Sequence, residues 1–244
     1  IRATFTVKYG SENQVFKPAG AKDFIKLPAG IAHFLEHKLF EEEKITPFQF
    51  FSKTNAYCNA STGYNRTMHL FDGPFHFKKN LNYLLDYVQR LYLTEANVLK
   101  EKGIIKQEIK MYENDPVGCL YDNLYGNLCF NSGVKESIAG SEKDIDDITK
   151  KDLELCYQTF YHPKNMFLVI SGNVNPQKTM AIVKENQANK IYAKPFKVIL
   201  DEQVEPDKIK ARETIIYKDV KISKLAVNFK INISHLKISK QTFN

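Results

Sequence analysis

Residues 30–40 carry the most informative pattern in the chain, Gly30-Ile31-Ala32-His33-Phe34-Leu35-Glu36-His37-Lys38-Leu39-Phe40. Its apolar residues recur at helical spacing, so we expect a helix over residues 31–40. His33 and His37 are four residues apart and therefore lie on one face of that helix, about one turn apart. Glu36 flanks the same face, which gathers three polar side chains inside an otherwise apolar helix.

This grouping is typical of a metal centre. Two imidazoles at this spacing can bind one zinc ion at ~2.0–2.1 Å. A carboxylate beside them can accept a proton from a zinc-activated water and later pass it to a leaving amine. The order H-x-x-E-H is the inverted zincin pattern, known as inverzincin. The alternative is a chance pairing on a surface helix. The apolar surroundings favour a metal, because burying three unpartnered polar groups costs several kcal/mol.

A catalytic zinc site needs a third protein ligand, and a predicted helix over 94–114 supplies candidates. Glu101 and Glu108 are seven residues apart, which places them two turns apart on one face. We predict that Glu108 binds the metal and that Glu101 supports catalysis by orienting one of the histidines. The alternative for Glu101 is a solvated carboxylate paired with Lys100 or Lys102.

Helices and strands alternate irregularly through the first 190 residues. Apolar periodicity and turn residues predict strands over 3–9, 23–27, 55–62, 66–72 and 166–170. They predict further helices over 46–51, 76–91, 117–130, 149–160 and 175–189.

The composition changes past Gln187, where charged residues and prolines become frequent. We therefore predict a zinc-binding domain over 1–190, a linker over 191–212, and the start of an incomplete second unit over 213–244. Strands over 213–219 and 224–231 would open that unit. The chain begins with a strand-like segment and without Met, so we expect it to have been cut from something longer.

Composition excludes several classes of function. The longest apolar runs fall short of the ~20 residues that cross a membrane, so we expect no membrane partner. The net charge is +7, but lysines are mixed with acidic residues along the chain, which argues for a solvated surface and against a nucleic-acid groove. The four cysteines show no C-x-x-C spacing, which favours reduced thiols in a cytoplasmic protein.

The quoted stretch 30–40 resembles the signature of the pitrilysin/insulinase family of zinc peptidases, most closely a Gram-positive bacterial branch. Glu101-Lys-Gly-Ile-Ile-Lys-Gln-Glu108 resembles the helix that carries two glutamates about seventy residues further on in that family. More family landmarks follow in order: Asn59-Ala60-Ser61-Thr62 with Thr67, Ile138-Ala139-Gly140, and Phe160-Tyr161-His162-Pro163-Lys164-Asn165-Met166.

The resemblance implies a two-layer α+β domain of the mitochondrial-processing-peptidase type, an antiparallel-rich sheet with helices on one face. It implies that His33, His37 and Glu108 bind Zn²⁺, that Glu36 is the general base and that Glu101 supports the site. It also implies that a substrate peptide adds as a strand to a sheet edge. The candidate edge is Asn59, Ala60, Ser61 and Thr62, for which the alternative is an ordinary hairpin strand.

The function implied is a zinc-dependent metalloendopeptidase that hydrolyses peptides through a metal-activated water. Family subunits close two related domains around the substrate, and the second domain supplies Arg and Tyr groups that find no match here. We therefore expect a second peptidase domain or a paralogous subunit as partner, and the chain by itself need not hydrolyse peptides. The alternatives are a non-catalytic peptide-binding or stabilising subunit, and a structural or regulatory domain with a metal-free polar cluster.

Overall fold

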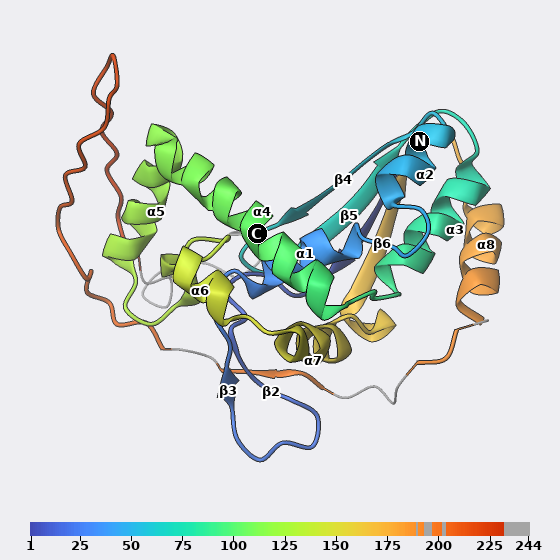
Figure 1. The fold of residues 1–244 in the computed structure, drawn as a ribbon, viewed down its shortest axis with the longest axis horizontal. Helices are drawn as coiled ribbons and strands as arrows, with labels where there is room; N and C mark the ends of the chain where they lie inside the picture. Colours follow the sequence, from blue (N-terminus) through green and yellow to red (C-terminus); the bar gives the residue numbers. More distant parts are fainter. Residues whose placement is uncertain (189, 193–196, 202–203, 232–244) are drawn as a thin grey trace.

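The computed structural model describes residues 1–188, 190–192, 197–201 and 204–231. A four-stranded sheet with the order β4-β5-β1-β6 forms its centre (Figure 1). The strands are β1 (Arg2–Val7), β4 (Tyr57–Thr62), β5 (Thr67–Asp72) and β6 (Met166–Ser171), and every neighbouring pair is antiparallel. A smaller sheet joins β2 (Val15–Lys17), β3 (Ile25–Lys26) and β7 (Ile199–Leu200).

Eight α-helices accompany these strands in the described residues. They are α1 (Ile31–Leu39), α2 (Pro47–Lys53), α3 (Phe77–Val88), α4 (Glu95–Asn114), α5 (Pro116–Leu128), α6 (Glu142–Asp147), α7 (Lys150–Phe160) and α8 (Pro176–Ala188). Short 3-10 turns cover Gly133–Lys135 and Pro163–Asn165.

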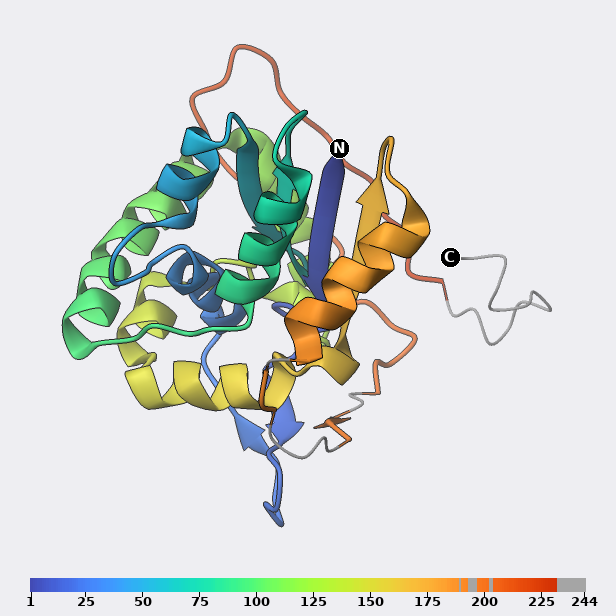
Figure 2. The same cartoon turned by 90° about the vertical axis from the view of Figure 1, so that its right-hand side faces the viewer.

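Strand alternation gives the large sheet one apolar face. Ala3, Phe5 and Val7 of β1 are buried side by side, and β5 places Phe71 and His69 opposite the first two of them. Helices α1 and α3 contact this sheet, and α8 packs beside α3 (Figure 2). The predicted two-layer α+β architecture, an antiparallel sheet with helices on one face, is confirmed.

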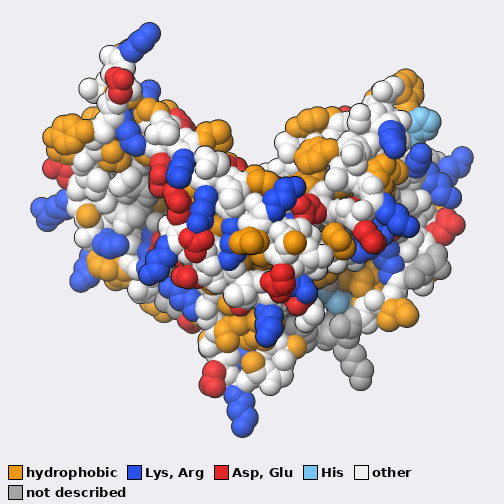
Figure 3. Space-filling model, in the orientation of Figure 1, with side chains coloured by type: hydrophobic (Ala, Val, Ile, Leu, Met, Phe, Trp, Pro, Cys, Tyr) orange, Lys and Arg blue, Asp and Glu red, His pale blue; other side chains and the backbone are white. Residues whose placement is uncertain are grey.

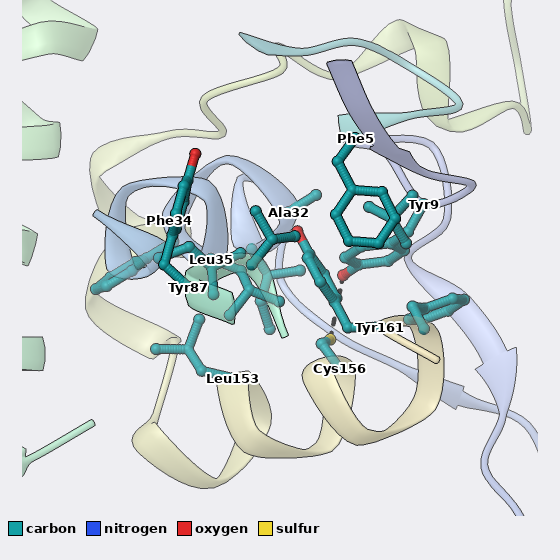
Figure 4. Close-up of a cluster of buried hydrophobic side chains, with 14 of the residues drawn as sticks. Phe5, Tyr9, Ala32, Phe34, Leu35, Tyr87, Leu153, Cys156 and Tyr161 are labelled. Carbon is teal, nitrogen blue, oxygen red and sulfur yellow. Dashed lines mark hydrogen bonds between the residues drawn. The ribbon is translucent and has the colours of Figure 1, made fainter. Parts of the chain in front are cut away.

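Helix α1 lies at the centre of the core. Its apolar residues Ala32, Phe34 and Leu35 are buried together with Leu153 of α7 and Tyr87 of α3 (Figure 4). Because all residues of α1 except His37 are buried, the helix is held rigidly, and the polar side chains that it carries are fixed with it.

The start of α1 meets a distant loop backbone to backbone. Gly30 caps α1 with φ +82°, and a Cβ at this position would lie 2.3 Å from the carbonyl oxygen of Ala139. Gly140 has φ +72°, and its Cβ would lie 2.6 Å from the carbonyl oxygen of Ala29. Only glycine accepts both the left-handed backbone and this contact. The loop around Ala139 is therefore seated on the amino end of α1.

Helix α4 runs alongside α1 and has well-defined ends. The hydroxyl of Thr94 accepts a hydrogen bond from the amide of Asn97, whose side chain accepts one from the Thr94 amide, completing a capping box. Asp115 precedes Pro116 and ends the helix, as the sequence predicts. The Asp115 carboxylate then caps α5 by accepting from the amides of Val117 and Gly118.

Two sequence predictions about the C-terminal part are wrong. The segments 213–219 and 224–231 form no strand, because their backbones find no ladder partner among the described residues and remain mostly exposed. Helix α6 and strand β2 were not predicted; both are too short for periodicity to show.

No helix in the described part of the chain is long and apolar enough to cross a membrane.

The predicted boundaries at 190 and 212 stay predictions. Residues 189, 193–196, 202–203 and 232–244, on which the predicted first domain, linker and second unit partly fall, lie outside the described residues.

Candidate metal centre

Helix α1 presents two histidines to α4. His33 is buried and His37 is partly buried, and their ring centroids are 4.5 Å apart. The four-residue spacing predicted from the sequence thus places both rings on one face of the helix.

Helix α4 brings Glu108 to the same point. Its carboxylate oxygens lie 3.6 Å from Nε2 of His33 and 3.3 Å from Nε2 of His37. The donor atoms of these three residues all lie within 4.8 Å of one another. Two ligands at ~2.0–2.1 Å from a tetrahedral zinc ion are about 3.4 Å apart. The spacing of the donors and their chemistry, two imidazoles and a carboxylate, therefore fit a zinc ion.

Glu101 lies behind His37. Its Oε1 is 2.9 Å from Nδ1 of His37, and its carboxylate is buried. Burial raises the pKa of Glu101, but the hydrogen bond from His37 and the charges of His37 and Lys38 outweigh it and leave the pKa lowered. This contact fixes the proton of His37 on Nδ1 and leaves Nε2 facing Glu108. The structure thus places Glu101 in the site and away from the solvated pairing with Lys100 or Lys102.

Glu36 is buried at the other side of the histidines. The hydroxyl of Thr62 donates a hydrogen bond of 2.5 Å to its Oε2. Thr62 lies 3.4 Å from the hydroxyl of Thr67, which in turn donates to the carbonyl of Tyr9. Burial raises the pKa of Glu36 even though the Thr62 hydrogen bond opposes this shift. A carboxylate whose pKa is raised toward neutrality suits proton transfer.

The charges of the remaining groups follow from their partners. Burial and the neighbouring His37 lower the pKa of His33 to about 4, so this ring is neutral. For His37, burial is outweighed by hydrogen bonds to Glu101 and Glu108, which raise its pKa to about 9. The hydrogen bond from His37 lowers the pKa of Glu108 to about 2. A metal at this point would replace the proton on Nε2 of His37.

A cleft of about 700 Å³ opens over these residues. Its walls are α1, α4, the start of α5, strand β4 and the loop 137–139. The molecule is notched between the side formed by α4 and α5 and the side that carries α2 and α3 (Figure 3). The predicted substrate residues Asn59, Ala60, Ser61 and Thr62 all line the cleft.

Strand β4 is an edge strand of the large sheet, as predicted for residues 55–62. Strand β4 pairs with β5 on one side only, and its residues 59–62 line the cleft. On the outer side of this strand, the amide of Ala60 donates to the side chain of its neighbour Asn59. An edge strand therefore borders the cleft.

Sequence reasoning missed several residues of the site. The hydroxyl of Tyr112 donates a hydrogen bond to Glu108, which the four-residue spacing on α4 could have revealed. The contact between Thr62 and Glu36, and the aromatic pair of Phe40 and Phe48 in the cleft wall, join separate elements. No local spacing signals such contacts.

Comparison with protein families gives a consistent result. The model described as Insulinase (Peptidase family M16) matches residues 25–142, and the model described as Peptidase M16 inactive domain matches residues 147–237. The chain belongs to the insulinase/pitrilysin (M16) family. The resemblance seen in the sequence is confirmed.

Similar proteins with curated names are described as zinc proteases. The chain is 43% identical, over 93% of its length, to a Bacillus subtilis protein named as the uncharacterized zinc protease YmfH. It is 26% identical, over 90% of its length, to the zinc protease PqqE of Helicobacter pylori. The chain spans about half of each relative, 53% and 51% of their lengths. The expected Gram-positive affinity is in line with the first of these.

Solved structures share the fold. A crystal structure described as a putative M16-like peptidase from Alicyclobacillus acidocaldarius matches with a TM-score of 0.83 and 38% identity, covering 86% of this chain and 49% of that one. A protease from Helicobacter pylori matches with a TM-score of 0.74 over 84% of this chain and 49% of that one; at 23% identity this likeness shows the fold alone.

Proposed function

We propose that this chain is the zinc-binding half of a metalloendopeptidase. The observation that carries the proposal is the convergence of His33, His37 and Glu108 within 4.8 Å, at the floor of a cleft that also contains Glu36. The names of the relatives, zinc proteases of the same family, support it.

The residues of this chain have separate tasks in that reaction. His33, His37 and Glu108 would hold the ion. Zinc bound there supplies a Lewis acid that polarises a carbonyl and lowers the pKa of water toward ~7. Glu36, held in orientation by Thr62, accepts a proton in the cleft and returns it to the leaving amine.

The edge position of β4 supports a peptide as substrate. Residues 59–62 line the cleft, and β4 pairs with β5 on one side only, so an added strand can pair with its other side. A bound peptide would displace the side chain of Asn59 from the amide of Ala60. The main chain of an extended peptide would bind there by the same hydrogen bonds that pair strands in the sheet. Such binding places little demand on the sequence of the peptide.

The chain accounts for about half of its curated relatives, and the cleft is open over β4 and α4. We propose that a second peptidase domain or a paralogous subunit covers the cleft and completes the site. The name mitochondrial-processing peptidase subunit beta, which belongs to a human relative 27% identical over 64% of this chain, supports a subunit arrangement of this kind.

Metal analysis and a peptidase assay test the proposal. We expect purified chain to bind about one equivalent of zinc, and Glu36→Gln to retain that zinc because Glu36 lies outside the ligand set. With the second half present, wild type should cleave an internally quenched peptide. Glu36→Gln should lose at least about a hundredfold in kcat, the scale of general base catalysis.

Two results would contradict the proposal. Zinc well below one equivalent in wild type would favour a metal-free polar cluster. A zinc-loaded protein that cleaves no peptide with the second half restored would favour the alternative, a non-catalytic peptide-binding or stabilising subunit. The full ligand set, with a base beside it, favours the enzyme.

We also propose that the chain acts in the cytoplasm. Its four cysteines are free thiols in the structure, the form that a reducing compartment maintains. Fractionation of the source cells tests this proposal, and recovery of the protein outside the cytoplasm would contradict it.

A further inference from the structure

Lys38 is an unexpected residue in the core. Its side chain is completely buried, although it carries an ammonium group on a four-carbon stem. Burying an unpaired charge is costly, so a lysine persists at such a position only with partners. It follows His37 directly on α1 but does not line the cleft.

The partners of Lys38 join α1 to α4. Its Nζ donates a hydrogen bond of 3.1 Å to the carbonyl oxygen of Asn97 and forms an ion pair with Glu41. It also lies 3.9 Å from Oε2 of Glu101. The ammonium therefore lies behind the metal centre, between the two helices that supply its ligands.

Glu101 uses its two oxygens in different directions. Oε1 accepts from Nδ1 of His37 at 2.9 Å, and Oε2 faces Lys38. A carboxylate that is hydrogen-bonded at one oxygen and faces a buried ammonium at 3.9 Å with the other is favoured in one orientation, and so is the imidazole hydrogen-bonded to it. This orientation directs Nε2 of His37 toward Glu108.

The positive charge of Lys38 also affects the electrostatics of the site. Glu36, Glu101 and Glu108 lie around the same two histidines, and three carboxylates in a partly dry cleft repel one another. The buried ammonium of Lys38, which Glu41 shares, lies on the far side of Glu101 and offsets part of that repulsion without competing for the metal.

We propose that Lys38 is a positioning residue of the metal centre, which acts by fixing the Glu101 carboxylate against His37. The inference rests on the proposed function, because it assigns Lys38 a role in zinc binding. A lysine that only held α1 against α4 would have no such effect on zinc binding.

Zinc affinity, measured by competition with a fluorescent chelator, tests this role. We expect Lys38→Met to weaken zinc binding about tenfold, the lower end of the effect of removing groups that orient metal ligands. Lys38→Arg keeps the charge and should recover part of the affinity. The matched control is Lys102→Met: Lys102 is one residue from Glu101, but its ammonium donates to the carbonyl of Asp146, so zinc affinity should not change.

A double-mutant cycle separates positioning from packing. If Lys38 acts through Glu101, Lys38→Met should cause no further loss of zinc affinity in a Glu101→Gln background. A purely structural lysine would instead lower affinity equally in both backgrounds, and that result would overturn the inference. Unfolding in the presence of chelator shows whether each variant is folded. If Lys38→Met does not fold, Lys38→Gln, which retains a donor for Asn97, replaces it in the cycle.

The two proposals fail in distinguishable ways. Wild type that takes up no zinc contradicts the proposed function and removes the basis of this inference. Wild type that binds zinc, with a folded Lys38→Met that binds it equally tightly, contradicts the role of Lys38 alone.

Discussion

At the scale of single residues, His69 shows how the same side chain can serve the core instead of the site. It is completely buried on β5, opposite Phe5 and Ala60, and neither ring nitrogen has a hydrogen-bond partner among the described residues. Its nearest rings are Phe40 and Tyr87, at centroid distances of 5.7 and 5.8 Å. Burial lowers its pKa to about 3.

His69 should make the fold sensitive to acid. In the unfolded chain its pKa is near 6.5, so between about pH 6.5 and 3 the unfolded state binds a proton that the folded state does not. Stability should therefore fall with decreasing pH in this window, by up to about 1.4 kcal/mol per pH unit from this residue. We expect His69→Leu, of similar volume, to remove this contribution, as measured by urea unfolding with chelator at pH 5 and pH 7.

The control for that experiment is His76→Asn. His76 is exposed and has φ +56°, a conformation that Asn tolerates. Because this variant keeps His69, it should show the same loss of stability toward acid as wild type. An equal acid response in wild type and His69→Leu would show that His69 does not titrate in the unfolding transition.

At the scale of elements, the metal centre depends on how α1 begins. The amino end of α1 contacts Ala139 and Gly140, and residues 137–139 of the same loop line the cleft. The histidines lie in the first two turns of α1, so a displacement of this end moves them relative to Glu108 on α4.

Two glycines with similar positive φ angles allow a matched test of the contact between Gly30 and Ala139. Gly20 has φ +76° and no atom within 4 Å of the place that an alanine methyl group would take, whereas Gly30 has φ +82° and the carbonyl of Ala139 at 2.3 Å. Gly20→Ala should cost only the left-handed penalty of about 1–2 kcal/mol. Gly30→Ala should cost about 1–3 kcal/mol more, because the loop must move. Equal losses in urea unfolding would contradict the tight contact.

At the scale of the whole molecule, the candidate ligands come from two helices that are distant in the chain. His33 and His37 lie on α1, and Glu108 lies on α4, with α2, β4, β5 and α3 between them in sequence. An ion held by both helices crosslinks them in the folded state only, so its binding free energy adds to folding stability.

Removal of the metal should therefore destabilise the protein. Free zinc at a hundred times its dissociation constant should add about 2.7 kcal/mol to the free energy of unfolding, and chelator should remove it. Glu108→Gln should abolish most of this zinc response. Glu113→Gln, an exposed glutamate on the same helix, should keep it. An undiminished response in Glu108→Gln would exclude Glu108 as a ligand.

The local features of the site could be predicted from the amino-acid sequence. Helical geometry places His33, Glu36 and His37 together, and it places Glu101 and Glu108, seven positions apart, on one face. The restriction before proline ends α4 at Asp115. The family, and with it the two-layer fold, followed from several such motifs in order.

The contacts between separate helices and strands could be known only from the tertiary structure. The distance from Glu108 to the two imidazoles, the hydrogen bond from Thr62 to Glu36, and the position of Lys38 behind Glu101 depend on how α1, α4 and β4 pack. Lys38 and Glu101 are 63 residues apart in sequence, and periodicity carries no information about such a contact. Burial and partner distance set the charge of each group, and both are properties of the packed chain.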